Sequence, residues 1–275
     1  YLGLRQMGMI LTINTNGTMI DEDLAAFFGK YKPRRVNITL YGTDEETYER
    51  LCHYPGGYEK TIRGIRLLQE QGVDVKVAGS LASANLADLD RLLDMEQELG
   101  VPVRVDTYML PATRERQLPF DEQSRLDPAE AARARIHALK REMGPELFPQ
   151  YVRQSIEQAD HPEPAEEVPG QMACMAGQCS FTINWQGEMR PCVILTEPAV
   201  SVFDAGFEAA WKQIVEETGK IRLNAKCTAC TLRHLCRTCA ASALLEAGSY
   251  DAVPEYMCRY AEESLRILRE ELEKY

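Results

Sequence analysis

Cysteine is nearly missing from the first 173 residues of this chain, where Cys52 stands alone. Secreted disulfide scaffolds are usually short and carry cysteines throughout, so this distribution argues against a disulfide framework. The chain also lacks any run of about 18 apolar residues, the length that a membrane-spanning helix needs. We therefore expect no membrane segment, and the free thiols favour a reducing, cytoplasmic compartment.

Positive charge is also scarce. The 275 residues contain 31 Lys and Arg against 42 Asp and Glu, which gives a net charge of −11. Because phosphate contacts depend on Lys and Arg, we expect no nucleic-acid partner. Hydrophobic residues make up 45% of the chain, enough for a real core in one large domain or two smaller ones.

Repeats and low-complexity tracts are absent as well, and residues 1–110 instead alternate between strand and helix patterns. Strands are expected at 9–14, 34–42, 73–81 and 101–110. Helices are expected at 21–30, 44–53, 58–72 and 85–100, with Asp21 and Thr43 as N-caps. This order predicts an α/β fold with a parallel sheet.

The predicted strands carry unusual polar residues: Asn14, Asn37, Thr39, Lys76, Arg104 and Asp106. Ligands of parallel α/β sheets usually sit at the C-terminal ends of the strands. We expect several of these side chains to line a polar pocket there.

Residues 111–170 are rich in proline and are expected to bridge two domains, with a helix at 127–144 and a loop at 161–170. Residues 171–275 form the cysteine-rich part. Gln186-Gly187 indicates a hairpin within 180–195. Helices are expected at 206–220, 240–248 and 259–274.

Eight cysteines fall in the last 102 residues: Cys174, Cys179, Cys192, Cys227, Cys230, Cys236, Cys239 and Cys258. Four of them follow the spacing C-x2-C-x5-C-x2-C: Cys227, Cys230, Cys236 and Cys239. Thiolates are soft ligands, and four per site suits zinc or an iron–sulfur cluster. Eight cysteines are two complete sets of four. In the zinc alternative, His234 is a further candidate ligand.

The cysteine array resembles the SPASM domain of radical AdoMet (radical SAM) enzymes. That motif begins with a Cys, 9–15 intervening residues, a Gly, four intervening residues and a second Cys. A C-x2-C-x5-C-x3-C knuckle and a final Cys follow. Here twelve residues separate Cys174 from Gly187, and four separate Gly187 from Cys192. The last gap of the knuckle, before Cys239, is two residues rather than three.

The resemblance implies two auxiliary [4Fe–4S] clusters with interleaved ligands. The first would be held by Cys174, Cys179, Cys192 and Cys239. The second would be held by Cys227, Cys230, Cys236 and Cys258.

The N-terminal half resembles the same family. ILTINTNGTMIDEDLAAFF is similar to the third strand and helix of a radical SAM barrel, and VNITLYG is similar to the fourth strand. The resemblance implies AdoMet contacts from Thr15, Asn16, Gly17 and Thr39. It predicts a partial (βα) radical SAM barrel of about four of six strands at 1–110, a bridge at 111–170 and a small α+β SPASM domain at 171–275.

The family's C-x3-C-x2-C motif, which binds the third [4Fe–4S] cluster that cleaves AdoMet, does not occur in these residues, nor does its Gly-Gly-Glu motif. We therefore expect a fragment of a longer enzyme, inactive alone, with a natural non-catalytic relative as the alternative. The resemblance implies a peptide or protein maturase that uses AdoMet-derived radicals and a reductant such as flavodoxin or ferredoxin. An iron–sulfur electron-transfer or binding module and a zinc-stabilised structural domain stay open as other functions.

Overall fold

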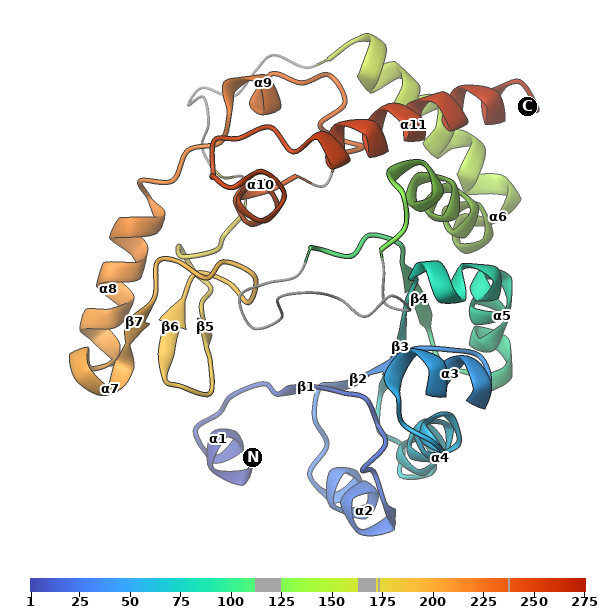
Figure 1. Cartoon of the computed structure of the whole chain (residues 1–275). Coiled ribbons are helices and arrows are strands. Elements are labelled where there is room, and N and C mark those ends of the chain that lie inside the picture. Colours follow the sequence, from blue (N-terminus) through green and yellow to red (C-terminus); the bar gives the residue numbers. More distant parts are fainter. Residues whose placement is uncertain (112–124, 163–171, 173, 237) are drawn as a thin grey trace. The chain divides into compact units, whose positions relative to one another are not determined.

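Four parallel strands form the sheet of the N-terminal part of the chain (Figure 1). The structure is a computed structural model that describes residues 1–111, 125–162, 172, 174–236 and 238–275. The strands follow the order β1-β2-β3-β4, with bounds β1 Thr12–Thr15, β2 Arg35–Leu40, β3 Val75–Ser80 and β4 Val103–Asp106. All four lie within or next to the ranges that the sequence predicts.

Helices connect consecutive strands and cover one face of this sheet (Figure 1). Their bounds are α1 Leu2–Gln6, α2 Glu22–Lys30, α3 Glu45–Cys52, α4 Gly57–Glu70, the 3-10 helix η1 Ser83–Asp88 and α5 Leu89–Leu99. In β2, the side chains of Val36, Ile38 and Leu40 are fully buried and alternate with half-exposed residues. The predicted α/β class and the four-stranded partial barrel are therefore confirmed.

Aspartates start two of these helices. The Asp21 carboxylate accepts a hydrogen bond from the Leu24 N–H at 2.8 Å, as predicted. For α3 the predicted cap, Thr43, is wrong: Asp44 is the N-cap and accepts from the Thr47 N–H at 2.7 Å. A carboxylate favours the positive end of the helix dipole more than a hydroxyl does, which explains the shift by one residue.

Helix α6, Pro128–Asp160, is two helices joined at a kink. Gly144 has a φ of 70° and breaks the helical conformation. The first half thus ends where the sequence predicts, while the second half, which begins at Pro145, is unexpected. Residues 112–124 and 163–170 of the predicted bridge lie outside the described residues, and so does most of the predicted loop at 161–170.

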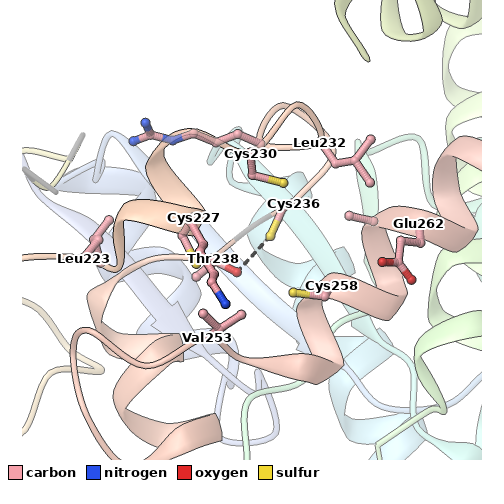
Figure 2. Close-up of a pocket in the computed structure, with 12 residues that line it drawn as sticks. Leu223, Cys227, Cys230, Leu232, Cys236, Thr238, Val253, Cys258 and Glu262 are labelled. Carbon is pink, nitrogen blue, oxygen red and sulfur yellow. Dashed lines mark hydrogen bonds between the residues drawn. The ribbon is translucent and has the colours of Figure 1, made fainter. Parts of the chain in front are cut away.

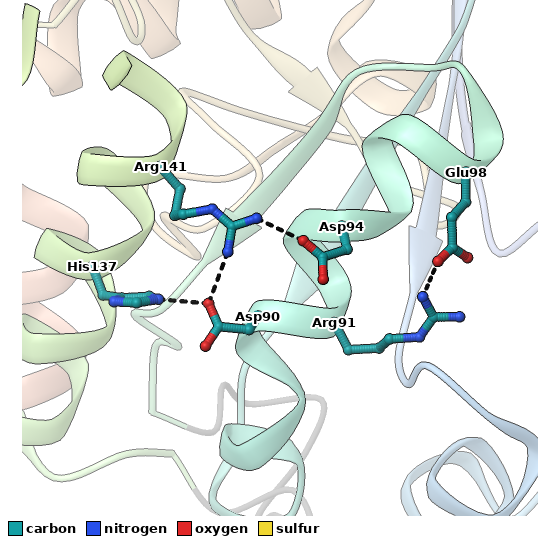
Figure 3. A network of polar contacts seen from close by, with 6 residues as sticks. All are labelled: Asp90, Arg91, Asp94, Glu98, His137 and Arg141. Carbon is teal, nitrogen blue, oxygen red and sulfur yellow. Dashed lines mark hydrogen bonds and ion pairs between the residues drawn. The ribbon is translucent and has the colours of Figure 1, made fainter. Parts of the chain in front are cut away.

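An ion-pair network joins the first half of α6 to α5 (Figure 3). His137 Nε2 lies 2.6 Å from an Asp90 carboxylate oxygen, and Arg141 binds both Asp90 and Asp94. The contact with His137, followed by that with Arg141, holds the pKa of Asp90 below its usual value. Both helices carry these groups on exposed faces, so the network orients the helices more than it stabilises them.

The C-terminal part contains the predicted hairpin and a third short strand. Its bounds are β5 Thr182–Ile183, β6 Glu188–Arg190, β7 Val200–Ser201, α7 Val202–Ala205, α8 Phe207–Thr218, α9 Ala225–Thr228, α10 Ala240–Ala247 and α11 Glu255–Leu272. The strands are antiparallel in the order β5-β6-β7. The Asn184 side chain accepts from the N–H groups of Gln186 and Glu188, and Gly187 has a φ of 79°, so side chain and glycine together close the turn.

The chain divides into two compact units. The first contains Tyr1–Met109 and the segment that ends at Pro145, and the second contains Glu146–Tyr275. The division falls beside the Gly144 kink, inside the segment that the sequence predicts as a bridge. In the described parts of the chain, every helix is too short or too polar to traverse a bilayer.

Candidate functional site: a thiol-lined cavity and a polar sheet face

Four of the predicted metal ligands line one cavity of the C-terminal unit. Cys227, Cys230, Cys236 and Cys258 surround a space of about 240 Å³. Figure 2 shows the sulfurs of Cys236 and Cys258 directed into it. These are the four cysteines that the resemblance assigns to the second auxiliary cluster.

Three separate elements bring these thiols together. Cys227 lies in α9, Cys230 and Cys236 follow in the loop, and Cys258 lies in the first turn of α11 rather than before the helix. The loop is fastened by His234, whose Nε2 lies 2.8 Å from the Ser155 carbonyl oxygen. Since that ring nitrogen donates to a backbone carbonyl, it is not available to a metal.

The thiols of this cavity influence one another electrostatically. Burial, followed by the nearby thiols of Cys236 and Cys230, raises the pKa of Cys227. Burial is also the main cause that raises the pKa of Cys258, followed by the nearby thiols of Cys236, Cys227 and Cys230. Four thiolates in this space would repel one another, so a bound cation or cationic cluster is what would stabilise their deprotonated form.

The chemistry of the four thiols suits either a zinc ion or an iron–sulfur cluster. Among the described residues, no group of three or more His, Cys, Asp or Glu side chains converges closely enough to hold one metal ion. A zinc ion needs all four sulfurs at about 2.3 Å from one point. An iron–sulfur cluster needs one thiolate for each iron, and four cysteines line this cavity.

The other four predicted ligands lie in two places. Cys192 and Cys239 pack against the same buried cluster, formed by Met172, Leu195, Ile221, Ala240 and Ala241. Cys174 and Cys179 are exposed and flank one tight turn, in which the Cys179 N–H donates to the Met175 carbonyl. The structure thus places Cys192 and Cys239 against one buried cluster and Cys174 and Cys179 on either side of one turn.

Backbone and hydroxyl donors surround the sulfurs of the packed pair. The Leu195 N–H donates to Cys192 Sγ at 3.3 Å. Cys239 is the N-cap residue of α10: its own N–H donates to the Ser242 hydroxyl at 2.7 Å, and that hydroxyl donates to Cys239 Sγ at 3.7 Å. Both sulfurs are therefore placed where negative charge is favoured, as thiolate ligands require.

In the N-terminal unit, the predicted polar residues share one face of the sheet. Strand register places Asn14 beside Asn37 and Asn37 beside Lys76, and it places Thr39 and Arg104 on either side of Ala78. These positions alternate with the buried core residues. The Asn37 amide donates to the Asn14 side-chain oxygen at 2.7 Å.

The predicted AdoMet turn follows β1 directly. The Gly17 N–H donates to Thr15 Oγ1 at 3.1 Å, and the Thr18 N–H donates to Asn16 Oδ1 at 3.2 Å. Gly17 has a φ of 78°, which favours glycine. Thr39 belongs to β2 and is half-buried.

Helix α4 holds this turn in place through two residues that sequence reasoning missed. Thr61 is fully buried, and its hydroxyl lies 3.1 Å from the Asn16 carbonyl oxygen. Gly64 lies so close to the turn that an added Cβ would sit 2.5 Å from the Gly17 carbonyl oxygen. Neither residue belongs to a motif, so only the packing of α4 against the turn identifies them.

Comparison with known proteins gives one family match, the Radical SAM superfamily model, over residues 2–95. The AdoMet-dependent heme synthase of Methanosarcina barkeri (strain Fusaro / DSM 804) is 23% identical over 259 residues, covering 88% of this chain and 72% of that protein. The antilisterial bacteriocin subtilosin biosynthesis protein AlbA of Bacillus subtilis (strain 168) is 22% identical over 187 residues, covering 67% and 38%.

Two solved structures have the same fold. Native anSMEcpe with bound AdoMet and Kp18Cys peptide has a TM-score of 0.63 at 17% identity, over 96% of this chain and 74% of that chain. SuiB from Streptococcus suis bound to precursor peptide SuiA has a TM-score of 0.61 at 16% identity, over 94% and 60%. The Radical SAM superfamily model therefore matches the part of the chain that contains strands β1, β2 and β3 of the parallel sheet.

Proposed function

We propose that this chain takes part in AdoMet-dependent radical modification of a peptide or protein, and that its C-terminal unit holds two auxiliary [4Fe–4S] clusters. The observation that carries the proposal is the cavity lined by Cys227, Cys230, Cys236 and Cys258. Such a cluster, when bound, transfers single electrons or anchors a substrate. Cys174, Cys179, Cys192 and Cys239 would hold the other.

Each part of the chain has a role in this proposal. The turn at Thr15, Asn16 and Gly17, together with Thr39, would contact AdoMet at the C-terminal ends of β1 and β2. The polar face with Asn37, Lys76 and Arg104 would face the substrate. A reductant such as flavodoxin or ferredoxin would supply electrons.

Metal analysis after anaerobic reconstitution tests the cluster assignment. We expect about eight iron and eight sulfide per chain, and about four of each in a Cys227→Ala/Cys258→Ala variant. Cys52→Ala is the matched control, because Cys52 belongs to neither set, and it should leave the iron count unchanged. Stoichiometric zinc without stable iron would instead support the zinc-stabilised structural domain.

The sequence contains no C-x3-C-x2-C, so residues 1–275 alone should not cleave AdoMet. We expect no 5′-deoxyadenosine above a protein-free control when reconstituted protein is incubated with AdoMet and dithionite. Formation of 5′-deoxyadenosine in proportion to protein would contradict this expectation.

A second candidate is an AdoMet-dependent reaction in haem synthesis. It is favoured by the likeness to proteins named AdoMet-dependent heme synthase, which covers 88% of this chain in the Methanosarcina protein. Lys76 and Arg104 on the polar face could pair with the carboxylates of a tetrapyrrole.

Binding measurements separate the two substrates. A tetrapyrrole that binds should shift its absorption band on titration with the protein, and Lys76→Ala should weaken the effect. A peptide substrate should produce no such band but should protect polar-face residues from hydrogen exchange. Saturable tetrapyrrole binding would favour haem synthesis over peptide modification.

A further inference from the structure

We propose that Thr238 raises the reduction potential of the cluster held by Cys227, Cys230, Cys236 and Cys258, through a hydrogen bond to the Cys236 sulfur. Thr238 Oγ1 lies 2.8 Å from Cys236 Sγ (Figure 2). The inference rests on the proposed cluster site and adds a residue that no ligand motif identifies. Thr238 touches a ligand rather than the metal, so it is a positioning residue.

The direction of this hydrogen bond follows from the chemistry of the ligand. In the metal-free protein either the thiol or the hydroxyl can donate. A metal ligand is a thiolate and has no proton, so it can only accept. With a cluster bound, the Thr238 hydroxyl must therefore donate to Cys236 Sγ.

Thr238 is distinctive within the cavity. Among the described residues that line the cavity, Thr238 carries the one hydroxyl group. Besides the four cysteines, the others have apolar or charged side chains: Leu223, Leu232, Val253, Ala261, Lys226, Arg233 and Glu262. A mostly apolar wall makes each hydrogen bond to sulfur count more, because water competes less for it.

Donation to a ligand sulfur has a definite sign. Reduction adds an electron that is partly shared by the thiolates, so a donor at sulfur stabilises the reduced cluster more than the oxidised one. Removal of the hydroxyl should therefore lower the potential. A change in packing alone has no reason to shift the potential in that direction.

The test is an anaerobic redox titration of the reconstituted 275-residue protein, monitored by electron paramagnetic resonance. The signal of this cluster is the one that disappears in Cys258→Ala, and the remaining signal serves as the internal reference. Thr238→Val removes the hydroxyl but keeps the shape, and Thr238→Ser keeps the hydroxyl. Thr228→Val is the matched control, since Thr228 is buried nearby and its hydroxyl donates to the Ala225 carbonyl rather than to sulfur.

We expect a lower potential for this cluster in Thr238→Val and wild-type potentials in Thr238→Ser and Thr228→Val, with the reference signal unmoved. If Thr238→Val loses this iron while Thr238→Ser retains it, the hydroxyl is needed to hold the cluster, which also supports the role. A fully loaded Thr238→Val that titrates at the wild-type potential would overturn the inference alone, as would an equal shift in Thr228→Val. Wild-type protein that takes up no iron would overturn the proposed cluster site and this inference together.

Discussion

Asn85 fastens the C-terminal ends of two neighbouring strands to the segment that follows them. Its side-chain amide donates to the carbonyls of Tyr41 and Ser80, both at 3.0 Å, and its oxygen accepts from the Ala82 N–H at 2.7 Å. The residue is almost fully buried. One side chain therefore satisfies three backbone groups at the edge of the sheet where the polar face ends.

We expect Asn85→Ala to destabilise the protein by roughly 2–4 kcal/mol, because it leaves these backbone groups without their partner in a buried place. Urea unfolding followed by circular dichroism measures the loss. Gln97→Ala on the exposed face of α5 is the matched control and should change stability by less than about 0.5 kcal/mol. Equal effects in the two variants would refute the role of Asn85.

Cys52 differs chemically from the exposed cysteines Cys174 and Cys179. Burial raises the pKa of its thiol to about 11, from 9.0, whereas Cys174 and Cys179 are exposed. Only the thiolate reacts, so we expect Cys52 in metal-free protein at pH 8 to be alkylated by iodoacetamide roughly a hundredfold more slowly than an ordinary thiol. Peptide mapping by mass spectrometry measures the rates.

The same labelling in guanidinium chloride is the control, because unfolding should restore an ordinary rate to Cys52. If Cys52 reacts in the folded protein as fast as Cys179, its burial does not protect it.

At the scale of elements, helix α4 determines the shape of the turn at residues 15–17. We expect Gly64→Ala to destabilise the protein by about 1–3 kcal/mol, since the new methyl group would collide with the Gly17 carbonyl. Thermal unfolding measures the change. Gly3→Ala in α1 is the matched control: its Cβ would meet nothing within 4 Å, so helix propensity should make that change neutral or stabilising by up to about 1 kcal/mol.

A Gly64→Ala protein as stable as Gly3→Ala would mean that α4 and the turn do not pack as closely as described.

Most elements could be predicted from the sequence because their patterns are local. The βα alternation of residues 1–110 and the hairpin around Gly187 depend on hydrophobic periodicity and turn residues, and both are present. The second half of α6 is not predicted because it lies in the proline-rich segment 111–170, although a proline such as Pro145 fits the first turn of a helix. Strand β7 has only two residues, too few for any pattern.

The residues of the candidate site likewise include some that the sequence predicts and some that it does not. The family resemblance, rather than spacing alone, predicts which thiols share a cluster, and the four that it assigns to the second cluster line one cavity. Thr238, Thr61 and Gly64 could not be predicted, because their roles come from contacts between segments that no spacing records. Likewise, only the structure shows that the Nε2 of His234 is engaged by the Ser155 carbonyl.

At the scale of the whole molecule, the chain consists of two compact units. All eight clustered cysteines lie in the second, so bound iron should stabilise that unit alone. We expect two calorimetric transitions in reconstituted protein, of which only one shifts to lower temperature when iron is removed. Cys227→Ala/Cys258→Ala should lower the same transition, and Cys52→Ala should not. A single transition that moves as a whole would contradict the independence of the units.

Cys239 is the N-cap residue of helix α10 and, in the proposed function, its sulfur also binds iron. Oxidation by oxygen would therefore affect helix α10 as well as the metal site. Conversion of this thiolate to a sulfinic or sulfonic acid removes a ligand and changes the group that meets the Ser242 hydroxyl. Exposure to air should then unwind the start of α10 as the iron is released. Oxidation of one sulfur atom would therefore be detected as a loss of helical structure.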